Sequence, residues 1–260
     1  MDLTIQPTRF QRWANAILRL PPRITFQTIN YLIASVTDDR PVHPREKFPW
    51  APNVEALYPE VRTEMEQMLR HVEMMPRVHD IIPTTEYIFT KRDWRQVPFY
   101  LYGAKIEEHC NLYPKTWEAF QRVEGLVVGT VSILSPGESV PLHDHTYKGL
   151  LIFHLGVIVP QEGDGCGMHI GKETITWDEG GVKVIDPTYE HETWNKTDRY
   201  RVLLLGELRR PDMPRILKFL DHLFVRLYLI SPMGKRLLRH AQAFAARHLE
   251  VVREEGVLAK

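Results

Sequence analysis

The sequence predicts an α+β protein in which a β-rich core lies between two helical segments. Apolar residues recur at spacings of three and four before residue 75 and again after Pro211, as in helices that bury one face. Between about residues 97 and 209, short β-rich runs alternate with turn sequences, which is typical of a β-sandwich or barrel. We therefore expect the 260 residues to form a single domain with three parts, residues 1–96, 97–211 and 212–260.

The first part, residues 1–96, is expected to be mainly helical. Pro21 and Pro22 end a first apolar repeat, and Asn53 is placed to cap an amphipathic helix. The apolar positions that predict these helices are Trp13, Ile17, Leu18, Ile29, Leu32, Ile33, Val54, Leu57, Val61, Met65, Met68, Leu69 and Val72.

The central part is expected to be a β core, interrupted by one helix near residues 114–123. Turn signals such as Ser135-Pro136-Gly137 and Glu179-Gly180-Gly181 separate its strands. The expected strands cover residues 99–102, 126–134, 149–160, 182–185 and 201–208.

Two helices are expected after Pro211, with Pro232 between them. The first has an apolar stripe beside Arg215, Lys218 and Arg226. We expect this stripe to cover the β core or to contact a second copy of the chain in a homodimer; the alternative is a peripheral contact with a membrane. The stripe consists of Ile216, Leu217, Leu220, Leu223, Phe224 and Leu227.

Composition narrows the class of protein. Lys and Arg number 33 and Asp and Glu also 33, a balance that argues against nucleic acid as a partner. Cys110 and Cys166 could form one disulfide at most, so a reducing cytoplasm is expected. No secretory signal pattern is visible at the start, and no uncharged apolar run reaches the roughly 18 residues of a membrane span. A soluble cytoplasmic protein, or one peripheral to a membrane, is therefore expected.

Three histidines lie where strands and turns are expected to meet. His143 and His145 are two residues apart, and His191 follows at a distance, a spacing from which a β-barrel can build a metal site. Arg201 opens an apolar strand, and an inward-facing arginine needs an anionic partner because an unpaired buried charge is costly. A dicarboxylate held between a metal ion and Arg201 would satisfy both groups, which suits Fe(II) and 2-oxoglutarate.

Each of these residues also has a purely structural interpretation. Histidines in a His-x-His pair are more often surface or core residues than ligands, and an inward arginine can pair with a structural carboxylate. The segment Cys166-Gly167-Met168-His169 resembles half of a zinc site, but no second pair follows it. A metal-binding sensor or scaffold without catalytic turnover is therefore the alternative to an enzyme.

The segment from Thr130 to Pro211 resembles the aspartyl/asparaginyl β-hydroxylase family of Fe(II)/2-oxoglutarate-dependent dioxygenases, which includes bacterial lipid A hydroxylases. A weaker resemblance extends back through residues 47–69. The stretches that carry it are residues 132–137 (SILSPG), His143, residues 154–156 (HLG), residues 176–180 (TWDEG), residues 189–194 (YEHETW), Arg201 and Arg210-Pro211.

The resemblance implies a double-stranded β-helix, also called a jelly roll, and a hydroxylase that uses Fe(II), 2-oxoglutarate and dioxygen. His143 and His191 match the family's iron ligands and are the expected catalytic residues. Ser132 and Arg201 match the residues that hold the distal carboxylate of 2-oxoglutarate, and His154 matches a residue near its metal-binding end. The substrate would be a peptide side chain, an amino-acid-like metabolite or a lipid acyl chain, with succinate and CO2 as co-products.

The sequence also departs from the family pattern. Leu150 and Ile152 stand where the animal peptide hydroxylases have two arginines, one for a substrate carboxylate and one for the cosubstrate, and Lys148 is the candidate to supply part of the missing charge. His145 stands where the relatives have glycine or aspartate. We expect His145 to be a third metal ligand. Asp144 could be the ligand in its place, or His145 could lie next to the metal and only hydrogen-bond a bound water or substrate.

Overall fold

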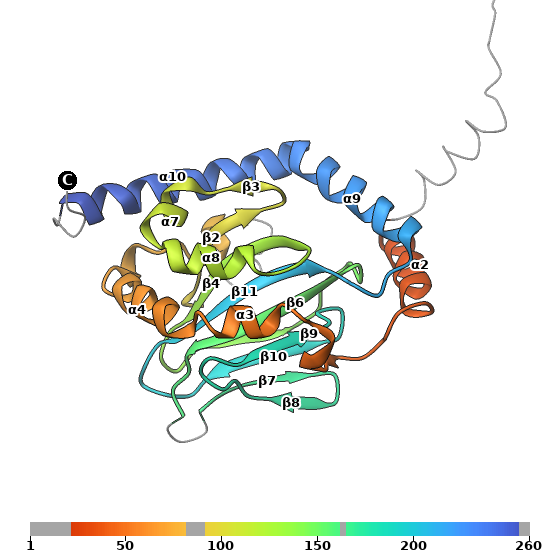
Figure 1. The fold of residues 1–260 in the computed structure, drawn as a ribbon, viewed down its shortest axis with the longest axis horizontal. Helices are drawn as coiled ribbons and strands as arrows, with labels where there is room; N and C mark the ends of the chain where they lie inside the picture. Colours follow the sequence, from red (N-terminus) through yellow and green to blue (C-terminus); the bar gives the residue numbers. More distant parts are fainter. Residues whose placement is uncertain (1–21, 82–91, 162–164, 255–260) are drawn as a thin grey trace, which may run out of the picture.

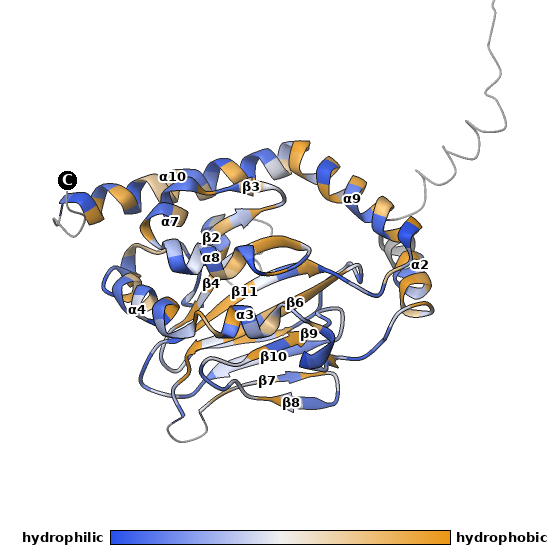
Figure 2. Ribbon diagram, in the orientation of Figure 1, coloured by the Kyte–Doolittle hydropathy of each residue, from blue (hydrophilic) through white to orange (hydrophobic). Residues whose placement is uncertain are grey.

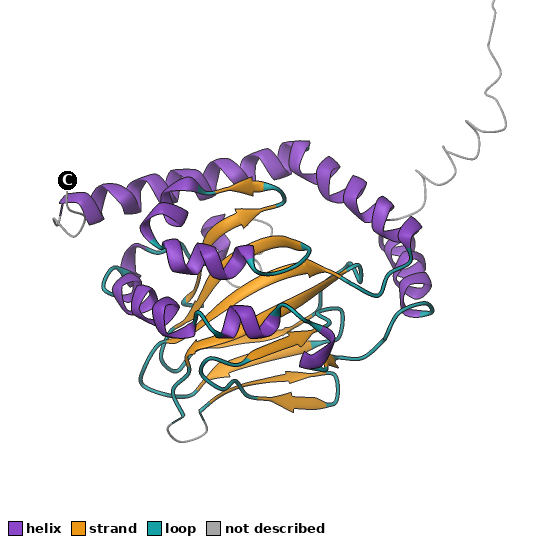
Figure 3. Cartoon of the chain, in the orientation of Figure 1, coloured by secondary structure: helices purple, strands orange, loops and turns teal. Residues whose placement is uncertain are grey.

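A computed structural model describes residues 22–81, 92–161 and 165–254 (Figure 1). The expected positions Trp13, Ile17, Leu18 and Pro21 lie outside these residues. Two antiparallel sheets form the core, and helices lie before and after them in the sequence, so the α+β prediction is confirmed (Figure 3). The helices are α2 (Pro22–Ala34), α3 (Ala51–Glu55), α4 (Tyr58–Leu69), α5 (Val78–Ile81), α7 (Glu107–Leu112), α8 (Pro114–Gln121), α9 (Arg215–Ile230) and α10 (Pro232–Glu254).

The larger sheet has seven strands in the order β1-β9-β6-β11-β4-β2-β3. Its strands are β1 (Val42–His43), β2 (Trp94–Leu101), β3 (Ala104–Lys105), β4 (Leu126–Leu134), β6 (Leu150–Ile158), β9 (Val182–Ile185) and β11 (Arg201–Arg209). The smaller sheet has the order β5-β10-β7-β8, formed by β5 (Ser139–His143), β7 (Cys166–Ile170), β8 (Glu173–Ile175) and β10 (His191–Asn195). From β4 to β11 the chain passes back and forth between the two sheets, with β7 and β8 together in the smaller one, so the core is a double-stranded β-helix, as expected.

Strand β11 shows how the larger sheet separates two environments. Val202 and Leu204 face a large apolar cluster that includes residues of α3, α4 and α8. Leu203, on the opposite face, packs with residues of the smaller sheet. Side chains alternate between the faces of a strand, so Arg201 and Glu207 share the inner face with Leu203. Both Arg201 and Glu207 line the cavity between the sheets.

The structure corrects several expected boundaries. The expected helix from Val54 to Val72 is two helices, α3 and α4, because Pro59 lies in the first turn of α4 and starts a new helix. Asn53 lies inside α3 and is not a cap. The expected strand ranges omit the short strands β5, β7, β8 and β10, although a strand end at His143 and a strand near His191 are part of the metal-site prediction. The three to five residues of each short strand are too few for a clear alternation pattern.

The apolar stripe predicted from the sequence after Pro211 lies on α9, but it is not packed on the core. Ile216, Leu220, Leu223 and Leu227 are all exposed, because α9 turns its opposite face, with Asp221 and Val225, toward the sheet. Leu217 is half-buried, and the side chain of Phe224 lies outside the described part of the chain. In the described segments, no helix has both the length and the apolar character that a membrane span requires.

Candidate metal and anion site

A cavity of about 550 Å³ lies between the two sheets and extends to α9 and α10. All six residues expected at the site line it: Ser132, His143, His145, His154, His191 and Arg201. Ser132, His154 and Arg201 come from β4, β6 and β11 of the larger sheet, whereas His143 and His191 come from β5 and β10 of the smaller one. Because the two sheets enclose one cavity, residues that are up to 69 positions apart in the sequence lie close together in it.

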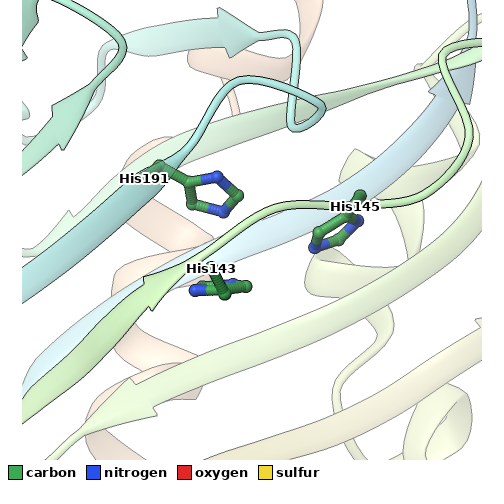
Figure 4. Close-up of side chains that lie close together, drawn as sticks. All are labelled: His143, His145 and His191. Carbon is green, nitrogen blue, oxygen red and sulfur yellow. The ribbon is translucent and has the colours of Figure 1, made fainter.

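The three histidines lie close together (Figure 4) and all line the cavity. His143 ends β5 and is the register partner of His191, which begins β10, and their ring centroids are 4.2 Å apart. His145 lies two residues beyond β5, held by a hydrogen bond from its backbone N–H to the carbonyl of Pro187 (2.8 Å). One ligand atom from each ring lies within 4.8 Å of the other two, so the three can hold one metal ion.

Two of these rings are oriented by backbone hydrogen bonds. The Nδ1–H of His143 donates to the carbonyl of Pro141, and that of His191 donates to the carbonyl of Tyr189, both at 2.8 Å. This arrangement places the proton on Nδ1 and the lone pair on Nε2, the tautomer that binds a metal ion. Burial lowers the pKa of His143 and lowers that of His191 to about 4, so both rings are neutral at pH 7.

His145 has the same neutral character as the other two rings. Burial and the neighbouring His191 and His143 lower its pKa. Asp144 also lines the cavity, but it is exposed to solvent and lies outside the three-histidine group. The geometry therefore fits His145 better than Asp144 as a third ligand.

Arg201 is a buried cation that has no acidic partner among the residues the structure describes. Its residue is 2% exposed, its Nη1–H donates to the hydroxyl of Thr193 (2.8 Å), and its guanidinium lies 5.1 Å from the ring of Trp177. Its Nε–H has no hydrogen-bond partner, and no carboxylate of the described residues lies within 4.0 Å of it. Burial lowers its pKa to about 10, which leaves it charged at pH 7. The cavity therefore contains a fixed positive charge that lacks its anion.

Two further polar groups lie in the same cavity. The hydroxyl of Ser132 accepts a hydrogen bond from the indole N–H of Trp94 (3.0 Å), so its own hydrogen can be donated. Nδ1 of His154 accepts from the indole N–H of Trp177 (3.3 Å), which assigns the proton of the neutral ring to Nε2. Burial, then the charge of Arg201, lower the pKa of His154 to about 3. Each of the two side chains is thus a hydrogen-bond donor for an anion.

The remaining sequence expectations have mixed outcomes. Leu150 and Ile152 line the cavity, so the absence of the two arginines makes this wall apolar. Lys148 does not supply the missing charge there: its ammonium binds the carboxylates of Asp186 (2.8 Å) and Asp39 (2.7 Å), and it does not line the cavity.

The half zinc site is also absent, since His169 is exposed on β7, whereas Cys166 is buried and donates to Asn195. In the described part of the chain, neither Cys110 nor Cys166 forms a disulfide.

Sequence reasoning missed Glu207. This carboxylate lines the cavity, and its Oε1 lies 4.0 Å from Nδ1 of His145. Burial raises its pKa to about 7. The signal was present in the sequence, because Arg201, Leu203, Leu205 and Glu207 follow the two-residue period of one strand face.

Fold and cavity together define a double-stranded β-helix protein with a histidine cluster and a buried arginine at its centre. Comparison with known families makes the assignment specific. The family described as Aspartyl/Asparaginyl beta-hydroxylase matches residues 55–211, more than half of the chain. The chain belongs to this hydroxylase family, as the resemblance in the sequence predicted.

Among curated relatives, an ornithine lipid ester-linked acyl 2-hydroxylase of Rhizobium tropici is 33% identical over 195 residues, which cover 75% of this chain and 69% of that protein. The aspartyl/asparaginyl beta-hydroxylase of Mus musculus is 33% identical over 137 residues, covering 51% of this chain but only 18% of that protein. Among solved structures, a double-stranded beta-helix protein of Klebsiella pneumoniae is 13% identical, with a TM-score of 0.27, over 34% of this chain and 72% of that one.

Proposed function

We propose that this protein is an Fe(II)/2-oxoglutarate-dependent dioxygenase that hydroxylates the acyl chain of a lipid. The observation that carries the proposal is the pairing, in one cavity, of three neutral histidines with a buried guanidinium that lacks an anion. Imidazole ligands suit Fe(II), and a buried charge of this kind is stable only when a ligand supplies the opposite charge. 2-Oxoglutarate has two carboxylates, one that can bind the iron and one that can bind the guanidinium of Arg201.

His143, His191 and His145 would hold the iron. Arg201 and Ser132 would bind the distal carboxylate of 2-oxoglutarate, with the guanidinium giving a charge-assisted hydrogen bond and the hydroxyl a neutral one. His154 would donate from Nε2 toward the metal-binding end of the cosubstrate. When bound, iron and 2-oxoglutarate supply the oxidising chemistry: of the two atoms of dioxygen, one enters the C–H bond and the other enters succinate as CO2 leaves.

The chain's own contribution is position and the exclusion of water. The cavity is lined mostly by apolar side chains, so a substrate C–H bond would lie in a dry environment next to the histidines. Ser132, His154 and Arg201, on β4, β6 and β11, would fix the cosubstrate in the same cavity.

The shape of the cavity favours an acyl chain over a peptide. Leu150 and Ile152 replace the arginines expected in a peptide hydroxylase, and both face the cavity. Its apolar lining continues away from the histidines to Val225 of α9 and Leu237 of α10. The relative that acts on a lipid acyl chain also aligns over more of this chain than the peptide hydroxylases do.

The test is succinate release by protein loaded with Fe(II) and ascorbate, with 2-oxoglutarate as cosubstrate and dioxygen present. We expect release to rise when ester-linked acyl lipids in detergent micelles are added, and mass spectrometry should find one added oxygen on the acyl chain. Aspartyl peptides should give no such rise. No succinate under any condition, with iron still bound, would instead favour the metal-binding sensor or scaffold.

A further inference from the structure

An exposed apolar stripe runs along α9. Six side chains at helical spacing and Met233 just beyond them are 46% to 65% exposed. Figure 2 shows apolar residues recurring along this helix. We call this surface the α9 stripe; it consists of Ile216, Phe219, Leu220, Leu223, Leu227, Ile230 and Met233. An apolar surface that recurs through every turn of a helix indicates a binding face, since single exposed apolar residues scatter without a period.

The stripe is not the core-facing side of a loosely packed helix. The opposite face of α9 is the one that contacts the protein: Asp221 is 1% exposed and binds Arg209 (2.7 Å), and Val225 is 4% exposed. Val225 also belongs to an apolar cluster with residues of β2, β4 and α10. The face with Asp221 and Val225 is therefore covered, whereas the described part of the chain leaves the α9 stripe exposed.

The exposed Asp, Glu, Lys and Arg side chains between Met213 and Leu249 are all basic. Between Met213 and Leu249 the only acidic residue is Asp221, which is buried and paired. Seven basic residues lie in the same segment: Arg215, Lys218, Arg226, Lys235, Arg236, Arg239 and Arg247. All but Lys218 among them are exposed. An apolar stripe beside basic residues without acidic ones matches the anionic surface of a lipid bilayer.

The stripe is also close to the cavity. Val225 and Tyr228, on the inner side of α9, line the cavity that contains the histidines, so one helix separates that cavity from the stripe. A second exposed apolar segment lies on and after α2, where Tyr31, Leu32 and Val36 are 75%, 52% and 51% exposed. It is tied to the start of α9, because the backbone N–H of Asp38 donates to the carboxylate of Asp212 (2.8 Å).

We propose that the α9 stripe docks this protein on an anionic lipid bilayer and that the docked helix lies between the bilayer and the cavity. The proposal builds on the proposed lipid substrate, because a two-chain lipid is presented at a bilayer surface and the enzyme must reach it there. The basic residues would meet the headgroups, and the stripe would insert into the boundary between headgroups and acyl chains.

The test is co-sedimentation of the metal-free protein with vesicles, which is independent of enzymatic activity. The vesicles contain either phosphatidylcholine alone or an equimolar mixture with phosphatidylglycerol. Wild-type protein should bind the anionic vesicles, and added salt should weaken the binding. The double variant Leu220→Asp/Leu223→Asp should reduce binding by about tenfold or more, and Arg226→Glu/Arg236→Glu should remove the preference for anionic vesicles.

Two control variants keep the test specific. Met74→Asp and Lys172→Glu alter an exposed apolar residue and an exposed lysine away from α9, and both should leave vesicle binding unchanged. Unchanged melting temperatures would show that all variants fold. The Leu220→Asp/Leu223→Asp variant should keep succinate release with a short-chain soluble substrate, while losing it with substrate embedded in vesicles.

The proposal fails if wild-type protein does not bind anionic vesicles or if the α9 variants bind as well as wild type. It also fails if wild-type protein sediments as a dimer that Leu220→Asp/Leu223→Asp converts to a monomer without vesicle binding, since the stripe is then a homodimer contact. If vesicle binding follows the expected pattern but no lipid stimulates succinate release, the docking surface stands and the proposed reaction is wrong.

Discussion

Replacing Arg201 with methionine should make the ligand-free protein more stable, although it should destroy the anion site. The pKa of this buried guanidinium is lowered from 12.5 to about 10 by burial. One pKa unit corresponds to about 1.4 kcal/mol, so keeping the charge in the cavity costs the folded state about 3 kcal/mol. At pH 7 arginine is charged in both the folded and the unfolded state, so the full cost of burying the charge lowers the free energy of unfolding. This cost falls only as the pH rises above about 10, where the folded protein can lose the proton.

Part of that gain is offset by contacts that the variant loses. The hydrogen bond to Thr193 contributes about 1 kcal/mol, and the contact with the Trp177 ring contributes a further ~0.5–1 kcal/mol. The net gain for Arg201→Met is then about 1–2 kcal/mol. For a chain of this size, that raises the melting temperature by about 2–8 °C.

The assay is thermal and urea unfolding of metal-free protein, followed by the same measurement with Mn(II) and 2-oxoglutarate. Wild-type protein should gain stability from 2-oxoglutarate, whereas Arg201→Met should require at least about tenfold more of it. Arg95 is the matched control: it is also 2% exposed, but it binds Asp93 and Glu73, both at 2.9 Å. Arg95→Met should therefore destabilise by about 3–5 kcal/mol. If Arg201→Met is destabilised like the control and responds to 2-oxoglutarate as wild type does, Arg201 has a structural role and the anion site is wrong.

Three further predictions concern the histidines, the loop before His191 and the cavity wall. His145→Ala should weaken Fe(II) binding by roughly tenfold, and Asp144→Ala should leave it unchanged, as measured by metal titration; the reverse pattern would make Asp144 the ligand. Asp186→Asn should lower the free energy of unfolding at pH 7 by about 3–5 kcal/mol, because it removes the buried carboxylate that binds Arg210 (2.6 Å in the wild type) and leaves this guanidinium the longer contact with Asp212 (3.4 Å). Although burial raises the pKa of Asp186, hydrogen bonds from a lysine and a threonine outweigh it, so the net shift is downward. The stability that the Asp186 carboxylate contributes is present above its pKa in the unfolded chain and is lost as the pH falls through its lower pKa in the folded protein. Urea unfolding should therefore show a smaller difference in unfolding free energy between wild type and Asp186→Asn at pH 3 than at pH 7. Leu150→Arg should abolish hydroxylation of acyl lipids while leaving basal succinate release measurable, and full activity on lipids would show that the acyl chain lies elsewhere.

Much of the candidate site could be predicted because its residues follow simple local rules. His143 and His145 are two residues apart at a strand end, so the two-residue period of a strand places both side chains on one side. Arg201 begins a strand that its apolar residues predict, and the same period places its side chain on the face of Leu203. The same period would have revealed Glu207, three steps further along the same face. The strands β4, β6, β9 and β11 were predicted within one or two residues because each is rich in apolar and β-branched residues.

Other features depended on contacts that no local pattern encodes. Lys148 lies five residues after His143, which suggested a role in the cavity, but the buried carboxylate of Asp186 fixes its ammonium elsewhere. The strand β10, which carries His191, has five residues and becomes a strand by pairing on both sides with β5 and β7. Its apolar content alone was too small to predict it.

The sequence by itself determined the order of helical and β segments, the residue types at the site and the family, since these follow from periodicity and from ordered motifs. Only the tertiary structure decided that Arg201 has no acidic partner among the described residues and that the α9 stripe faces outward. Both are properties of what surrounds a side chain in space. An amphipathic pattern states that a helix has an apolar face but not whether the protein covers it, and an arginine in an apolar strand must face a cavity before its missing anion can be recognised.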